Sequence, residues 1–188
     1  MKIRNAKEIL EDLKKVSQII VDLGYSAILQ NERDLALEAI VMKRKINELS
    51  YEIRLSIIYA SKSAWTTRKE IEQLASILQV GVAAKEISDG VEDLIAIVLR
   101  GEGAHPILRT VFGRRHVMKI LKIPEEVEKI SIQSLEIPED VEIVYIRRDD
   151  TLIFPPIKEN FVLRKGDILL INGPSSKIED VRRNINKR

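Results

Sequence analysis

The sequence contains no cysteine and has few aromatic residues, which make up 4% of its 188 positions. Without thiols the chain can form no disulfide and offers no thiolate ligand to a metal ion. This composition suits a reducing compartment, so we expect a cytoplasmic protein, although exported proteins can also lack cysteine. With one tryptophan and three phenylalanines, the core must consist mainly of isoleucine, leucine, valine and alanine.

Long uninterrupted apolar runs are also missing, because charged side chains interrupt every window approaching the ~18 residues that a membrane-spanning helix needs. Any membrane role is therefore expected to depend on a partner. The 31 basic and 29 acidic residues nearly cancel, so the surface has no general attraction for nucleic acid. Hydrophobic residues at 45% and charged residues at 32% predict a folded chain, with the lysine, glutamate and isoleucine content typical of a thermophile.

The first hundred residues show the periodicity of long amphipathic helices. Steps of three and four place one apolar stripe on each of two helices. The first stripe is Ile9, Leu13, Val16, Ile20, Leu23 and Ala27, and the second is Leu35, Ala39, Met42, Ile46, Leu49, Ile53, Ile57 and Ala60. Two such helices joined by a short connection are expected to pack antiparallel.

A third helix is expected to begin after Thr67, with Glu70 at the capping-box position. Gly81 is interpreted as a break before a fourth helix. The inward residues expected are Ile71, Leu74, Ile77 and Leu78 in the third helix, and Val82, Ala83, Ile87, Val91, Leu94, Ile95 and Val98 in the fourth. Residues 1–106 are thus predicted to form an antiparallel helical bundle.

A glycine-rich stretch over residues 101–106 ends the helical region, and residues 107–116 are expected to be a linker or short helix. Beyond it, β-branched residues and prolines replace the helical periodicity. Strands are expected at 117–123, 141–146, 152–154 and 168–171, followed by a helix that Ser175 caps. The fold class predicted is α+β multidomain, with a small α/β domain over residues 117–188.

The second domain resembles the TrkA-C family, the C-terminal domain of regulators of potassium conductance. The motifs that carry the resemblance stand in family order. They are the leading strand 117–123, Ser134-Leu135-Glu136-Ile137, Val144-Tyr145-Ile146-Arg147-Arg148-Asp149, Ile153-Phe154-Pro155, Leu163, Gly166-Asp167-Ile168-Leu169-Leu170 and Asn172-Gly173-Pro174. Gly166 is expected to supply a positive φ, and Asp167 to accept from backbone amides, so both are read as fold-specifying residues.

The TrkA-C resemblance implies a homodimer through the C-terminal domain and a small anionic or nucleotide ligand near the dimer interface. Candidate ligand-binding residues are Arg147, Arg148 and Asp149, because paired guanidinium groups at a strand end can bind phosphate or carboxylate. Solvated or structural charge is the competing interpretation. No residue names the ligand, and no cofactor is predicted.

The helical domain resembles half of the PhoU fold, with Ile46-Asn47-Glu48-Leu49 and Ile87-Ser88-Asp89 with Glu92 as the matching segments. The metal motif of that family needs carboxylates four residues apart. Lys43 and Lys85 occupy the corresponding places here, so no metal is predicted. Asp89 and Asp93 keep the spacing, but a solvated acidic face explains them better.

Neither an enzyme nor a nucleic-acid binder is expected. The two histidines, His105 and His116, have no partner at metal-ligand spacing, and no nucleophile motif or phosphate-binding glycine pattern is present. Basic clusters at 114–116 and 182–188 lie in no recognised binding motif. The function predicted is an archaeal-type cytosolic regulator of potassium or cation transport that acts on a membrane channel or transporter. The alternative is a PhoU-like interaction protein in phosphate-uptake signalling.

Overall fold

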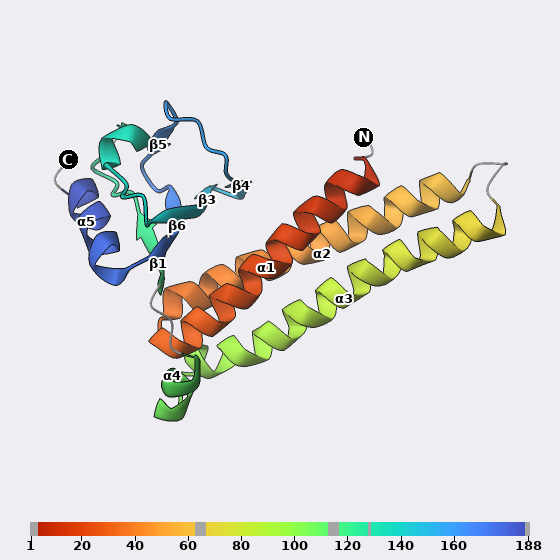
Figure 1. The fold of residues 1–188 in the computed structure, drawn as a ribbon, viewed down its shortest axis with the longest axis horizontal. Helices are drawn as coiled ribbons and strands as arrows, with labels where there is room; N and C mark the ends of the chain where they lie inside the picture. Colours follow the sequence, from red (N-terminus) through yellow and green to blue (C-terminus); the bar gives the residue numbers. More distant parts are fainter. Residues whose placement is uncertain (1–3, 63–66, 113–116, 128, 187–188) are drawn as a thin grey trace. The chain divides into compact units, whose positions relative to one another are not determined.

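The computed structural model describes residues 4–62, 67–112, 117–127 and 129–186. The chain divides into two compact units, Met1–Pro106 and Ile107–Arg188. The first is helical, and the second combines two small antiparallel sheets with helices (Figure 1). The fold class predicted from the sequence is confirmed.

The helical unit consists of α1 (Ala6–Gln30), α2 (Arg33–Ser61) and α3 (Arg68–Leu99), which pack against one another. Asn5 caps α1, and Asn31, with φ of 56°, ends it in the left-handed region before α2 begins. Thr67 and Glu70 form the predicted capping box at the start of α3. The α1 stripe expected from the sequence and the α2 stripe up to Ile57 are buried, whereas Ala60 at the end of α2 is exposed.

The predicted break at Gly81 is wrong, because α3 runs through this residue without interruption. Gly81 instead allows close packing against α2. A Cβ at this position would lie 3.1 Å from Ile53 Cγ2, and the Ser50 hydroxyl donates to the Gly81 carbonyl at 3.1 Å. One glycine costs a helix only about 1 kcal/mol, which the packing of a long helix readily offsets.

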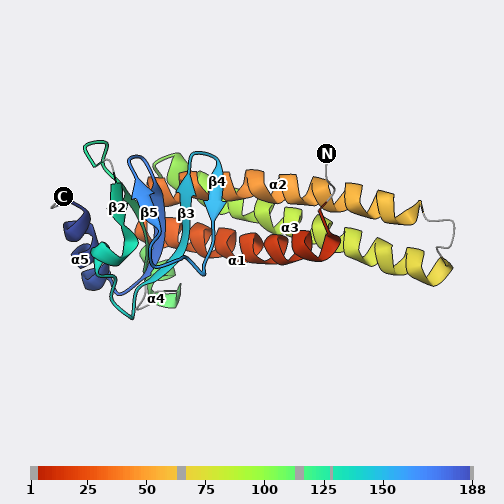
Figure 2. The same ribbon diagram turned by 90° about the horizontal axis from the view of Figure 1, so that it is seen from above.

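Several residues predicted to face inward on α3 are instead exposed. Ile71 is 53% and Ile87 46% exposed, and Ala83 is exposed as well. Figure 2 shows the reason at the start of α3, where α2 and α3 continue past the N-terminal end of α1 and no third helix covers them. Periodicity therefore identifies the apolar face of a helix but not the length over which a neighbour covers it.

Helix α4 spans Pro106–Phe112, so all but its first residue belong to the C-terminal unit, and of the linker or short helix expected over residues 107–116 the structure has a short helix. Residues 113–116, which include the end of the predicted linker and a predicted basic cluster, lie outside the described residues, as do 187–188. The remaining elements are β1 (Val117–Lys122), β2 (Lys129–Ser131), the 3-10 helix η1 (Ile132–Leu135), β3 (Glu142–Arg148), β4 (Thr151–Ile153), β5 (Val162–Arg164), β6 (Ile168–Gly173) and α5 (Ser175–Asn186).

The larger sheet has the order β1-β6-β3-β4, and β2 pairs with β5 in a second sheet. All strand pairs are antiparallel. The four strands of the larger sheet correspond to the four predicted strands, whereas β2 and β5 were not predicted. Each has only three residues, too few for alternation to be recognised, and neither is followed by paired prolines like those that end the equally short β4.

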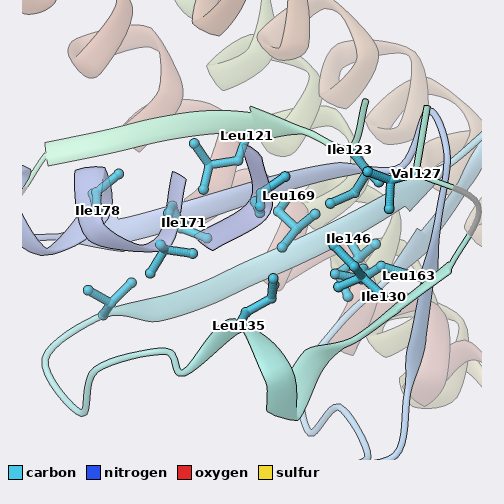
Figure 3. Close-up of a cluster of buried hydrophobic side chains, with 13 residues drawn as sticks. Leu121, Ile123, Val127, Ile130, Leu135, Ile146, Leu163, Leu169, Ile171 and Ile178 are labelled. Carbon is cyan, nitrogen blue, oxygen red and sulfur yellow. The ribbon is translucent and has the colours of Figure 1, made fainter. Parts of the chain in front are cut away.

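One face of the larger sheet packs on α5 and on the segment that carries β2 and η1 (Figure 3). The residues of this core are aliphatic throughout, as the aromatic-poor composition predicted. They are Leu121, Ile123, Val127, Ile130, Leu135, Val141, Ile146, Leu163, Leu169, Ile171, Ile178, Val181 and Ile185. This core places the β3–β4 turn, which carries the predicted site, at one end of the sheet.

Gly24→Ala tests the packing of α1 on α3. An added Cβ would lie 2.6 Å from Val91 Cγ1, inside van der Waals contact. In an open helix this change stabilises by about 0.5–1 kcal/mol, but here overpacking is expected to cost about 1–3 kcal/mol in urea unfolding followed by circular dichroism. Adding Val91→Ala makes room, so the double variant should lose less than the sum of the single losses. A Gly24→Ala variant more stable than the parent would contradict the contact.

Candidate ligand-binding site

The predicted site lies at the end of β3 and in the turn that follows. Arg148 pairs with Thr151 across β3 and β4, so Asp149 and Asp150 form a two-residue turn. Asp149 has φ of 52°, a left-handed conformation that aspartate adopts more readily than most residues. All three predicted residues are therefore neighbours at one sheet end, although their side chains have different surroundings.

Arg148 binds a carboxylate of the chain itself. Its Nε lies 2.9 Å from Asp167 Oδ1 and its Nη2 lies 2.7 Å from Asp167 Oδ2, in the bidentate geometry expected for a bound anion. Nη2 also donates to the Val162 carbonyl at 2.8 Å, and the guanidinium carbon lies 5.2 Å from the centre of the Phe161 ring. The Nε and Nη2 donors of Arg148 are thus used by acceptors of the domain itself.

Asp167 is the other half of this contact and is 1% exposed. Besides Arg148, its carboxylate accepts from the Arg164 backbone amide at 2.8 Å, as the sequence predicted for this aspartate. Gly166 before it has φ of 77°, which confirms the predicted turn. The hydrogen bond to Asp167 is the largest cause of a raised Arg148 pKa, so the guanidinium stays charged at any working pH.

Arg147 points away from Arg148, because successive side chains on a strand lie on opposite faces of the sheet. In register it stands between Leu152 on β4 and Ile168 on β6, and it is half-buried. Its Nη1 donates to the Asp149 carbonyl at 3.3 Å. The two guanidinium groups therefore do not converge on one anion. Ligand binding by this segment stays a prediction, and Arg147 is the residue to which it now applies.

Lys43, at a position where the PhoU resemblance places a metal ligand, forms ion pairs in the helical unit. Its ammonium lies 2.7 Å from Asp89 Oδ1 and also pairs with Glu92, while Lys85 lies 2.7 Å from Asp89 Oδ2. Hydrogen bonds to Asp89 and Glu92 raise the pKa of Lys43, and the hydrogen bonds from Lys43 and Lys85 lower the pKa of Asp89. A lysine thus supplies the positive charge between these carboxylates.

No group of three or more histidine, aspartate or glutamate side chains in the described part of the chain is arranged to hold a metal ion. Asp93, the spacing partner of Asp89, is exposed one turn further along α3. Asp89 instead forms ion pairs with the ammonium groups of Lys43 and Lys85.

A comparison with protein families finds a match, and it lies in the C-terminal unit. Residues 120–186, from the middle of β1 to the end of α5, match the TrkA-C domain family. The C-terminal unit contains a TrkA-C domain. This domain links the chain to the regulation of potassium or other cation transport. No curated protein matches the chain, and none of the described helices is long and apolar enough to cross a membrane.

Two features of the site could not be found from the sequence alone. Arg148 and Asp167 stand 19 residues apart, and only the pairing of β3 with β6 brings them together. Lys43 meets Asp89 and Glu92 through the packing of α2 on α3. In both cases the sequence shows the charged residues but not the distant segment that each of them meets.

Asp167→Asn is expected to destabilise the TrkA-C domain by about 1–3 kcal/mol, because the half-buried Arg148 guanidinium loses the charge of its buried partner. Amide hydrogen exchange resolved to β3 and β6 measures the effect in the full chain. Asp150→Asn, in the exposed β3–β4 turn, is the matched control and should change stability by less than about 0.5 kcal/mol. Equal exchange in the two variants would show that the Arg148–Asp167 pair does not support the domain.

Proposed function

We propose that the chain is a regulatory protein of potassium or other cation transport, whose TrkA-C domain binds a small anionic ligand. The TrkA-C domain at residues 120–186 is the observation that carries this proposal. The helical unit, α1 to α3, is the part that docks onto a membrane channel or transporter. The chain acts in the cytoplasm and reaches the membrane surface through that partner.

The ligand site is placed at the β3–β4 end of the TrkA-C sheet, with Arg147 as the anion contact. Arg148 shapes this end without meeting the ligand, because Asp167 and the Val162 carbonyl use its donors. Two copies associate through this domain. Ligand binding changes the output only when it favours one arrangement of the two copies, since equal affinity for both shifts nothing.

No catalytic role is proposed. The ion pairs of Lys43 and Lys85 with Asp89 and Glu92 join oppositely charged groups at the helix surface, an arrangement that provides no acid–base pair around a substrate. A role in phosphate-uptake signalling is the second candidate, and the observation in its favour is the unit of three long helices. The lysine pairs at the expected metal positions weigh against the full resemblance.

An anionic ligand is expected to raise the unfolding temperature of the full chain, by the equivalent of about 2.7 kcal/mol at 100 times its Kd. The compounds to compare are cyclic dinucleotides, ATP, NADH, phosphate, potassium chloride and magnesium chloride. Arg147→Ala should remove the shift, whereas Arg164→Ala, an exposed arginine of β5, should keep it. No shift with any anion would count against ligand sensing.

Affinity purification of the tagged full chain from detergent-solubilised membranes separates the two candidate functions. A potassium channel or transporter subunit is the expected partner. Its binding should depend on a specific surface of the helical unit and not on general charge attraction, so its recovery should persist at moderate salt. Recovery of a phosphate transporter or a signalling kinase in its place would favour the second candidate.

A further inference from the structure

Helix α3 carries two apolar stripes, only one of which is fully buried by the described helices of its unit. The inner stripe packs on α1 and α2 and is buried. It consists of Gly81, Ala84, Ser88, Val91, Ile95 and Val98. The outer stripe consists of Val80, Ala83, Ile87, Gly90, Leu94 and Ile97, at steps of three, four, three, four and three. Val80 is 50% and Ile87 46% exposed, and none of the six is fully buried.

Alternating steps of three and four along one helix face are the pattern of a seam that packs against another helix. Helices α1 and α2 already cover the inner stripe, so the outer stripe, about 100° away around α3, lies beside that contact and stays partly or fully exposed. Its polar neighbours are Glu86 and Asp93 on the outer edge. An uncovered seam of this length is therefore a surface for a helix from outside the chain.

Gly90, in the middle of the seam, supports close approach by a partner. A Cβ at this position would meet nothing within 4 Å, so packing inside the chain does not require glycine. Glycine in a helix interior costs about 0.5–1 kcal/mol relative to alanine. The cost is offset when the missing side chain makes room for a large residue of another helix.

We propose that the C-terminal part of the outer stripe, from Ile87 to Ile97, is an interface with a second copy of this chain, in which α3 packs antiparallel on α3 about a two-fold axis near residue 92. In this register Leu94 of each copy fills the space at Gly90 of the other, and Ile87 meets Ile97. Glu86 of each copy lies beside Arg100 of the other, whose guanidinium also pairs with Glu102 of its own chain, so opposite charges meet on both sides of the axis.

The alternatives fit less well. A parallel pair would place Gly90 against Gly90 and leave a gap at the centre of the seam. The other antiparallel register, with Ala83 against Leu94, would place Glu86 beside Asp93 twice, and like charges at such positions repel. The chosen register has one like-charge pair, Asp93 with Asp93, at the exposed edge. Because the same surface is used by both copies, the assembly closes as a dimer.

The absence of native cysteine makes a direct test possible. Asp93→Cys places a thiol beside the proposed axis, so a short thiol-specific crosslinker should convert the full chain to a covalent dimer on a denaturing gel. Ala75→Cys is the matched control, equally exposed on α3 but 18 residues away. At ~1.5 Å per residue its two copies would lie roughly 50 Å apart, so no crosslink is expected.

A blocking variant connects the crosslink to the seam. Gly90→Gln adds a side chain where Leu94 of the second copy is placed, while glutamine favours the helix more than glycine does, so the helical signal and unfolding temperature should not fall. In the Asp93→Cys background it should reduce crosslinking to the Ala75→Cys level.

Failure to crosslink through Asp93→Cys, or crosslinking that Gly90→Gln leaves unchanged, would overturn the α3 interface. Sedimentation of the same samples separates this result from the proposed TrkA-C dimer. A chain that sediments as a dimer yet does not crosslink at position 93 is joined through another surface.

Discussion

The carboxylate of Asp167 is the contact on which the C-terminal unit depends. It joins β3 of the larger sheet, through the Arg148 guanidinium, to the backbone of β5 in the smaller sheet. A buried carboxylate destabilises a fold unless its oxygens accept hydrogen bonds. Asp167 keeps its hydrogen bonds only while β3 and β5 hold their present positions relative to each other. The aliphatic core supplies the burial, and this ion pair determines how the sheets are aligned.

The same ion pair decides which residues remain for a ligand. The Arg148 guanidinium can bind an anion, but its Nε and Nη2 already donate to the Asp167 carboxylate. Arg147, on the other face of β3, is left as the candidate contact. Paired arginines on a strand are therefore better regarded as two separate sites than as one, because the strand directs them apart.

In the helical unit, a lysine lies between two carboxylates. Lys43 joins α2 to α3 through Asp89 and Glu92. These pairs are largely at the surface, where each contributes little stability, so their main effect is to favour one alignment of the helices. Burial of the inner stripe of α3 supplies the stability, and the outer stripe remains available for association. On the two proposals above, the TrkA-C domain and this helix together hold two copies of the chain.

Local patterns in the sequence determined the helices, the four strands of the larger sheet and the helix boundaries that depend on capping. The stripe from Ile9 to Ala27 and the capping box at Thr67 are local features, and local hydrogen bonding and periodicity are enough to form them. Gly81 shows the limit, since its local preference for a break is weaker than the packing of a continuous α3 on Ile53. The short pair β2 and β5, the partner of Arg148 and the exposure of Ile87 were decided by tertiary structure alone. Each depends on which distant segment lies alongside, and such non-local contacts are not contained in any one stretch of the sequence.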